Sequence, residues 1–200
     1  VEVASEFRYR NPIITPTTLV VAVSQSGETA DTIAAIRDAR IKGARVFGIT
    51  NVVGSTVARE SVGVIYTKAN KEIAVASTKS FLGQVVSLTL LSMLLAQSKG
   101  KLTTGQIRLL FSELADTAEQ VEAILADASS VEEAALACRD AKSALFVGRG
   151  MGAAVANEGA LKLKEISYLH AEAYPAGEMK HGPIALIEDG FPVIAIATNS

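Results

Sequence analysis

The sequence has 200 residues, of which 49% are hydrophobic and 20% are charged, and its formal net charge is -2. A chain of this size can bury a substantial core as one large or two smaller globular units. Its charges are interspersed, which indicates neither a nucleic-acid partner nor a membrane-surface partner. The single cysteine, Cys138, excludes an internal disulfide framework and a cysteine-rich metal site. We therefore expect a soluble, cytoplasmic protein with no metal and no other cofactor.

Three further features of composition have plain structural interpretations. Cys138 lies in a helical pattern with no histidine nearby, which favours a small, partly buried residue over a nucleophile. The most apolar stretch, residues 85–96, is interrupted by polar residues and is shorter than the roughly 20 residues of a transmembrane helix. We expect it to be a buried core helix. The polar opening of the chain, with Glu2 and Glu6, predicts no signal peptide.

Short apolar runs alternate with helical patterns in the first half of the chain. Residues 19–23 are contiguous, valine-rich and apolar, which suits a parallel strand covered on both faces. A turn at 24–27 leads into a helical pattern at 28–42 that ends at Gly43. Two more strands, at 46–49 and 62–66, and a long apolar helix at 78–97 are expected to follow. Residues 1–10 resemble an interior strand and its turn, so we expect the chain to be a fragment of a longer protein.

The same order returns in the second half. After a helical region at 103–142, we expect a strand at 144–147, a glycine-rich turn at 148–152, a helix at 153–168 and a strand at 191–197. Strand–turn–helix thus occurs twice, about 125 residues apart. This alternation predicts an α/β fold of doubly wound parallel sheets with right-handed crossovers. Ligands of such sheets bind beyond the carboxyl ends of the strands, so residues 24–29 and 148–152 are the first places to look for a site.

Residues 24–29 read Ser-Gln-Ser-Gly-Glu-Thr and combine hydroxyl side chains with one glycine at the start of a helix. The free N–H groups of a helix N-terminus attract an anion, and the hydroxyls add neutral donors. This chemistry suits a phosphate monoester held without metal. The spacing is not that of a Walker loop, because no lysine follows the glycine. The alternative is a serine-capped helix with no ligand.

A second strand-end segment, residues 72–79, has Ser77 or Thr78 in position to cap the long helix. Taken alone, its pattern favours capping over ligand binding. A third segment places Glu158, Lys162 and Glu165 at helical spacing, so a helix puts them on one face. That face could be solvated and ion-paired, or it could lie in a crevice. In a crevice, a carboxylate beside a lysine is suited to proton transfer between adjacent carbons.

The fourth segment, residues 177–183, is an irregular loop that holds His181 between a lysine and a Gly-Pro pair. Loops on such scaffolds often carry function, and histidine titrates near neutral pH. From the residues alone, a functional histidine and a plain surface histidine are equally supported. The other histidine, His170, falls in the segment that ends the preceding helix, and we expect it to be structural.

Together these segments resemble one family. Residues 4–10 (Ala-Ser-Glu-Phe-Arg-Tyr-Arg), 24–29, 75–79, 158–168 and 176–183 occur in the order found in the isomerase portion of the glutamine–fructose-6-phosphate aminotransferases. That portion consists of two sugar isomerase (SIS) domains. The resemblance implies a first SIS domain at 1–115 without its N-terminal strand–turn–helix, a helical connection at 116–142, and the N-terminal part of a second SIS domain at 143–200.

The resemblance also implies roles for individual residues. The sugar phosphate, fructose 6-phosphate or the product glucosamine 6-phosphate, would be bound by Ser24, Gln25, Ser26, Thr29, the backbone of Val75 and the side chain of Ser77. Glu165 would move the proton between carbons 1 and 2, with Lys162 beside it helping the enediol to form. His181 would open the sugar ring and, in this family, reaches the site of a neighbouring subunit, which implies a homodimer.

Three parts of the family pattern have no match in this sequence. They are the glutaminase domain with its N-terminal cysteine, the Cys-Gly-Thr-Ser turn of the first SIS domain, and the C-terminal tail whose lysine forms the Schiff base. We therefore expect the 200-residue chain alone to be inactive, with the glutaminase domain elsewhere in the same full-length protein. Two alternatives are an SIS-type amino-sugar-phosphate deaminase or isomerase without a glutaminase domain, and a sugar-phosphate-sensing SIS regulator. The Glu-Thr at 28–29 and the loop at 178–183 favour the aminotransferase.

Overall fold

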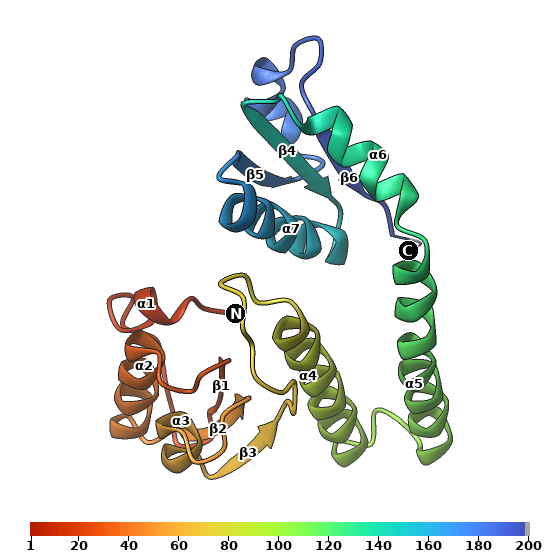
Figure 1. Ribbon diagram of the computed structural model, residues 1–200. Coiled ribbons are helices and arrows are strands. Elements are labelled where there is room, and N and C mark those ends of the chain that lie inside the picture. The colour runs from red at the N-terminus through yellow and green to blue at the C-terminus, as the bar shows by residue number, and fades with distance from the viewer. Residues whose placement is uncertain (199–200) are drawn as a thin grey trace. The chain divides into compact units, whose positions relative to one another are not determined.

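The computed structural model describes residues 1–198, so the last two residues of the expected domain at 143–200 lie outside it (Figure 1). The chain divides into two compact units, Val1–Ala115 and Asp116–Ser200. Each unit contains one three-stranded parallel sheet. The α/β class with parallel sheets, expected from the alternation of apolar runs and helical patterns, is confirmed.

The sheet of the first unit has the order β1-β2-β3. Its strands and connecting helices are β1 (Leu19–Ser24), α2 (Ala30–Ile41), β2 (Arg45–Thr50), α3 (Thr56–Glu60) and β3 (Gly63–Tyr66). Ser24 pairs with Thr50, and Thr50 with Tyr66, so all three strands end at the same edge. The predicted strands and the helix at 28–42 are confirmed within about two residues, whereas the sequence did not predict α3.

The core of this unit lies between its sheet and its helices. Ala22 from β1, Ile36 from α2, Val46 from β2 and Val57 from α3 form one buried cluster. Ile36, Val46 and Val57 are at most 1% exposed. Complete burial of an aliphatic side chain of this size contributes about 1.5–3 kcal/mol. These contacts therefore fix β1 and β2 relative to α2 and α3.

The long apolar helix α4 (Lys79–Ser98) follows at the predicted place, but its burial was predicted wrongly. Only Ser80, Ser87 and Leu91 are buried, while Leu82 and Leu94 are 51% and 61% exposed. The apolar composition of a helix shows that much of its surface is hydrophobic. It does not show whether other residues of the same unit pack against that surface. By length and composition α4 could cross a membrane, a test that core helices of soluble proteins also pass.

The opening segment also differs from the expectation. Residues 1–10 were predicted to form a strand and its turn, but Ala4–Phe7 form a short helix, α1, that contacts α2. The Arg10 guanidinium and the Glu2 carboxylate form an ion pair of 2.6 Å across this helix. The alternation of Val1 and Val3 misled the prediction, because a strand also needs a neighbouring strand as a hydrogen-bonding partner.

The second unit has the sheet order β5-β4-β6. After α5 (Thr104–Ala126), which runs across the boundary between the units, its elements are α6 (Ser129–Cys138), β4 (Ser143–Gly148), α7 (Met151–Ser167), β5 (His170–Pro175), the 3-10 helices η1 (Met179–His181) and η2 (Pro183–Leu186), and β6 (Val193–Ile196). The predicted helical region at 103–142, the strands at 144–147 and 191–197, and the helix at 153–168 are confirmed with shifted ends. Cys138 is partly buried at the end of α6, as expected.

Strand β5 was not predicted, because His170 was assigned to the end of the preceding helix. Tyr168 adopts a left-handed conformation with φ of 61° and ends α7. His170 then begins β5, which pairs in parallel with β4 from Ser143 onward. The alternation of polar residues with Ala171 and Ala173 was the signal for a strand, but alanine has no strong preference for strands.

Candidate functional site

The turn after β1 joins the first strand directly to α2. Ser24 is the last residue of β1, and Thr29 occupies the N-cap position of α2. The Thr29 side chain makes no capping hydrogen bond; its hydroxyl shares one of 3.0 Å with the hydroxyl of Ser24. Simple capping of α2 by a hydroxyl therefore does not explain why these residues occur here.

Two serine hydroxyls close the turn on itself. Ser24 Oγ accepts the N–H of Gly27 at 3.0 Å, and Ser26 Oγ accepts the N–H of Glu28 at 3.2 Å. Ser24 is buried, whereas Gln25 and Ser26 are half-buried and Thr29 is exposed. An arriving anion could take over these N–H groups, leaving the hydroxyls free to donate to it as well. The turn thus holds two of its backbone N–H groups in place by internal hydrogen bonds.

Glycine is required at position 27. Gly27 has φ of 64°, and a Cβ atom there would lie 2.1 Å from Ser55 Oγ. Its carbonyl oxygen accepts the N–H of Val57 at 3.0 Å. The turn is therefore pressed closely against the start of α3, and no side chain fits between them.

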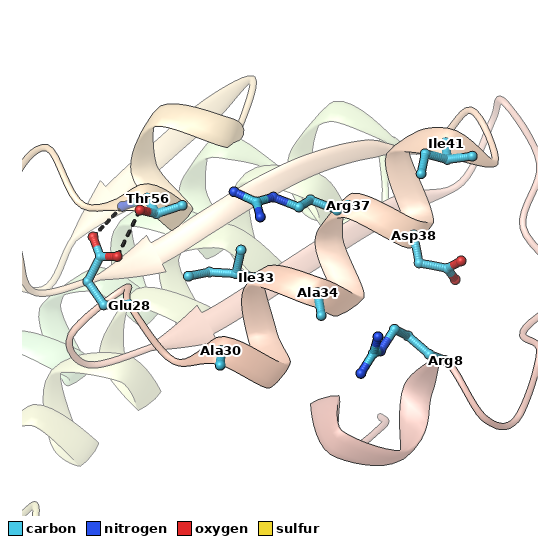
Figure 2. Close-up of a pocket in the computed structure, with 9 residues that line it drawn as sticks. All are labelled: Arg8, Glu28, Ala30, Ile33, Ala34, Arg37, Asp38, Ile41 and Thr56. Atoms are coloured by element: carbon cyan, nitrogen blue, oxygen red, sulfur yellow. Dashed lines mark hydrogen bonds between the residues drawn. The ribbon is translucent and has the colours of Figure 1, made fainter.

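Glu28 bonds the turn to α3 in a second way. Its carboxylate accepts the N–H of Thr56 at 2.7 Å and the Thr56 hydroxyl at 2.8 Å (Figure 2). These two hydrogen bonds hold the pKa of Glu28 below its usual value. Glu28 also borders an open pocket of about 590 Å³ along α2, between Arg8 and Thr56. None of Ser24, Gln25, Ser26 and Thr29 lines this pocket, so it is separate from the predicted phosphate site.

The segment between β3 and α4 carries Val75 and Ser77. Val75 is exposed and Ser77 is half-buried. The prediction that Ser77 or Thr78 caps α4 is confirmed for the position of the N-cap residue but is wrong about the capping hydrogen bond. Thr78 occupies the N-cap position without a side-chain bond, and Glu72 supplies the cap. Its carboxylate accepts the Ser80 hydroxyl at 2.6 Å and the Ser80 N–H at 3.1 Å, which lowers the pKa of Glu72. A carboxylate suits this position better than a hydroxyl because it also interacts with the helix dipole.

In the second unit, α7 places three charged side chains on one face, as predicted. Lys162 Nζ lies 2.5 Å from Glu165 Oε2 and 3.3 Å from Glu158 Oε1. The three side chains are between 19% and 28% exposed, so the face is neither fully solvated nor fully buried. Burial acts to lower the pKa of Lys162, but its bonds to the two carboxylates outweigh this and raise it. Lys162 is therefore a stable ammonium group at neutral pH.

His181 was expected in an irregular loop, but it is the last residue of the 3-10 helix η1. It is exposed, and the next residue, Gly182, has φ of 144°. The predicted residues fall into two groups: those for phosphate binding lie in the first unit, and Lys162, Glu165 and His181 lie in the second. The structure brings Lys162 and Glu165 into contact, and it brings Ser24 and Thr29 into contact.

Sequence reasoning missed the residues that support these segments, above all Asn51 and Thr56. Asn51 comes directly after β2 at the same sheet edge as Ser24. The rule that ligands bind beyond the carboxyl ends of parallel strands could have identified Asn51, but no glycine or cluster of hydroxyls drew attention to it. Thr56 had no comparable signal, because its role depends on where Glu28 lies in space.

Comparisons with known proteins agree with this architecture. The family model described as "SIS domain" matches residues 1–94 and 138–200. The chain is 55% identical over 200 residues to the glutamine–fructose-6-phosphate aminotransferase (isomerizing) of Chlorobaculum tepidum, covering 100% of this chain and 32% of that protein. It is 55% identical over 198 residues to the protein of the same name from Symbiobacterium thermophilum, covering 99% and 32%. The chain thus spans about a third of the length of these curated relatives.

Two solved structures show how far the likeness extends. The C-terminal domain of glucosamine-fructose-6-phosphate aminotransferase from Francisella tularensis superposes with a TM-score of 0.96 at 42% identity, covering 100% of this chain and 57% of that one. Glucosamine-6-phosphate deaminase from Thermotoga maritima superposes with a TM-score of 0.73 at 26% identity, covering 96% and 56%. The chain therefore belongs to the SIS domain family, and it matches a segment of the glutamine–fructose-6-phosphate aminotransferases along its whole length.

Proposed function

We propose that this chain is part of the isomerase portion of an enzyme that converts fructose 6-phosphate and glutamine to glucosamine 6-phosphate and glutamate. The observation that carries the proposal is the pairing of Glu165 with Lys162 at 2.5 Å. It occurs in a chain whose whole length matches about a third of a glutamine–fructose-6-phosphate aminotransferase. The hydroxyl turn at 24–29 adds a site whose donors suit a phosphate monoester.

Phosphate binding is assigned to the first unit. The N–H groups of Gly27 and Glu28 would turn from Ser24 and Ser26 to the phosphate oxygens, and the hydroxyls of Ser24, Ser26 and Thr29 would add donors. Gln25, the backbone of Val75 and the side chain of Ser77 would contact the rest of the sugar phosphate. Because Glu72 already caps α4, the Ser77 hydroxyl is not needed for capping.

Proton transfer is assigned to the second unit. Glu165 would remove a proton from carbon 1 of the open-chain substrate and return it to carbon 2, so that it ends the step ionised as it began. The neighbouring Lys162 ammonium would stabilise the negative charge that develops on the enediol oxygen. Its raised pKa keeps it charged for this purpose. His181 would transfer the proton that opens the sugar ring, from a loop where its side chain is exposed.

The remaining assignments belong to the same proposal. Residues 1–115 would form most of a first SIS domain, 116–142 a helical connection, and 143–200 the beginning of a second SIS domain. The full-length protein would add a glutaminase domain, act as a cytoplasmic homodimer, and need no metal or other cofactor. The 200-residue chain by itself would not form glucosamine 6-phosphate.

The second candidate is an amino-sugar-phosphate deaminase without a glutaminase domain. The superposition on the Thermotoga maritima protein named glucosamine-6-phosphate deaminase supports it, although at only 26% identity. The two functions are separated by the ammonia donor. An aminotransferase would form glucosamine 6-phosphate from glutamine, whereas a deaminase would release ammonia from glucosamine 6-phosphate and ignore glutamine.

The test is Glu165→Gln in the full-length protein that contains this segment. We expect isomerisation of fructose 6-phosphate to fall by about 10²–10⁴-fold, the usual contribution of a positioned general base. Binding of fructose 6-phosphate, measured as a rise in thermal midpoint, should be retained. Glu132→Gln, on the exposed surface of α6, is the matched control and should leave both unchanged. Turnover that survives Glu165→Gln would show that the assigned base is wrong.

A further inference from the structure

Asn51 lies between the two substrate-contact segments of the first unit. It directly follows β2, the central strand of the sheet, whose neighbours are β1 and β3. The turn at 24–29, to which phosphate binding is assigned and which we call the phosphate-binding turn, begins at the end of β1. The segment leading to Val75 and Ser77 begins after β3. A residue in this position can contact both segments at once.

The backbone of Asn51 contacts the phosphate-binding turn. Its N–H donates to the carbonyl oxygen of Gln25 at 3.0 Å, and the preceding Thr50 hydroxyl donates to the same oxygen at 3.3 Å. The Gln25 peptide group therefore has a fixed orientation. This matters because the neighbouring N–H groups of the turn are the ones assigned to the phosphate.

The side chain of Asn51 contacts the other segment through both ends of its amide. Oδ1 accepts the Thr67 hydroxyl at 3.0 Å and the N–H of Ala69 at 2.9 Å. Nδ2 donates to the carbonyl oxygen of Asn70 at 2.6 Å. These contacts require one acceptor and one donor at adjacent positions, which an asparagine amide supplies.

The segment held by these bonds has an unfavourable backbone conformation. Lys68 and Asn70 have φ of 52° and 56°, in the left-handed region that non-glycine residues rarely occupy. Such conformations persist where the surroundings over-determine them. Asn51 supplies three of those determining contacts, while Glu72 fixes the other end of the segment at Ser80. Val75 and Ser77 lie between Glu72 and Ser80.

We propose that Asn51 is a positioning residue that sets the phosphate-binding turn and the segment carrying Val75 and Ser77 in register for one sugar phosphate. The inference rests on the proposed function and adds to it a residue that contacts no substrate. Its amide determines the distance between two groups of substrate contacts that come from different strands. An error in that distance weakens binding even when both groups remain intact.

The test is Asn51→Ala in the full-length protein. We expect KM for fructose 6-phosphate to rise about tenfold or more with little change in kcat, because substrate and transition state lose the same contacts. Hydrogen exchange of residues 67–70 should speed up in the absence of ligand. Asn157→Ala removes a single amide bond to the Ala153 carbonyl on the exposed surface of α7 and is the matched control. It should change neither value.

A milder variant keeps the inference testable if Asn51→Ala does not fold. Thr67→Val removes only the hydroxyl bond to Asn51 Oδ1 and should raise KM by roughly threefold. A lower thermal midpoint with unchanged KM in either folded variant would overturn the inference and leave Asn51 a purely structural residue. If the unsubstituted protein neither binds nor isomerises fructose 6-phosphate, the proposed function fails, and this inference fails with it.

Discussion

Both units contain a parallel strand, a short turn and a helix in the same order, but the two turns have different chemistry. The turn between β1 and α2 carries the hydroxyls of Ser24, Ser26 and Thr29 around one glycine. The turn between β4 and α7 carries Gly148, Gly150 and Gly152 and contains no hydroxyl side chain. The same topology therefore offers a cluster of hydroxyl donors in one unit, whereas the turn of the other unit is glycine-rich and carries Arg149 as its one charged side chain.

The glycines of the second unit allow close packing. A Cβ atom on Gly148 would lie 2.2 Å from backbone atoms of Gly152, and one on Gly159 would lie 2.9 Å from the Phe146 ring. Helix α7 thus lies unusually close to β4 both at its first turn and at its middle. This rigid contact fixes the later part of α7, which carries Lys162 and Glu165. In the first unit the candidate functional side chains lie in the turn, whereas in the second unit they lie on one face of α7.

The largest effect is expected from breaking the close contact in the second unit. Gly148→Ala places a methyl group against the Gly152 and Ala153 backbone, which cannot yield without moving α7. We expect a loss of about 3 kcal/mol or more in the free energy of unfolding of this unit, because the clash is with backbone. Hydrogen exchange of β4 and α7 in the full-length protein measures it. Gly177→Ala is the control, since a Cβ atom there has no atom within 4 Å and, like Gly148, Gly177 has no positive φ. Equal effects of the two would contradict the packing argument.

Gly27→Ala is expected to cost less stability than Gly148→Ala but to have a larger effect on ligand binding. The added methyl group meets the side chain of Ser55, not backbone, so part of the clash can relax. We expect about 1–3 kcal/mol of destabilisation together with loss of sugar-phosphate binding, measured by thermal shift. Gly54→Ala shares the positive φ without any clash and should keep binding.

The double variant Gly27→Ala, Ser55→Gly sharpens this prediction. Removing the Ser55 side chain takes away the atom nearest to the new methyl group, although Thr50 Oγ1 remains at 2.7 Å. Part of the lost stability should return. If the double variant is no more stable than Gly27→Ala, contact with the Ser55 side chain at the start of α3 is not what requires glycine, and the cost comes from positive φ and from Thr50 Oγ1.

The contrast between the units also shows what a sequence can and cannot predict. Strands β1, β2 and β4 were predictable because a short run of contiguous apolar residues, such as Val20–Val23, is typical of a buried strand. Helix α7 and the shared face of Lys162 and Glu165 followed from helical spacing. Strand β5 was missed because its alternating residues are alanines, and α1 because two valines resembled a strand that has no partner.

The candidate site was predictable only where its chemistry is concentrated in a motif. Ser24–Thr29 stands out because hydroxyls and a glycine follow a strand. The capping of α4 by Glu72, in place of Ser77 or Thr78, was not predictable. It depends on a loop that brings the Glu72 carboxylate to Ser80, eight residues later in the chain. Asn51 makes contacts 16 to 19 residues away, and nothing in its local sequence records them.

The smallest expected effect is a difference in pH sensitivity between the two units. In the first unit, hydrogen bonding from Arg37 lowers the pKa of Glu60, whose side chain is 18% exposed. A carboxylate with a lowered pKa contributes stability that is present above its unfolded value, about 4.5, and is lost as the pH falls through the folded value. In the second unit, the raised pKa of Lys162 has the opposite sign. Its contribution is complete below the unfolded value of 10.5 and is lost as the pH rises through the folded one.

Two variants separate these contributions in thermal unfolding followed by circular dichroism from acid to alkaline pH. Glu60→Gln should flatten the loss of stability below about pH 4.5 and leave the alkaline side unchanged. Lys162→Met should reduce the loss above about pH 10.5, where Tyr174 also contributes, and leave the acid side unchanged. Arg10, in the exposed ion pair with Glu2, supplies the control, because Arg10→Gln should alter neither limb. If either variant changed both limbs equally, the two ion pairs would not be independent, and the separation of the chain into two units would not extend to its electrostatics.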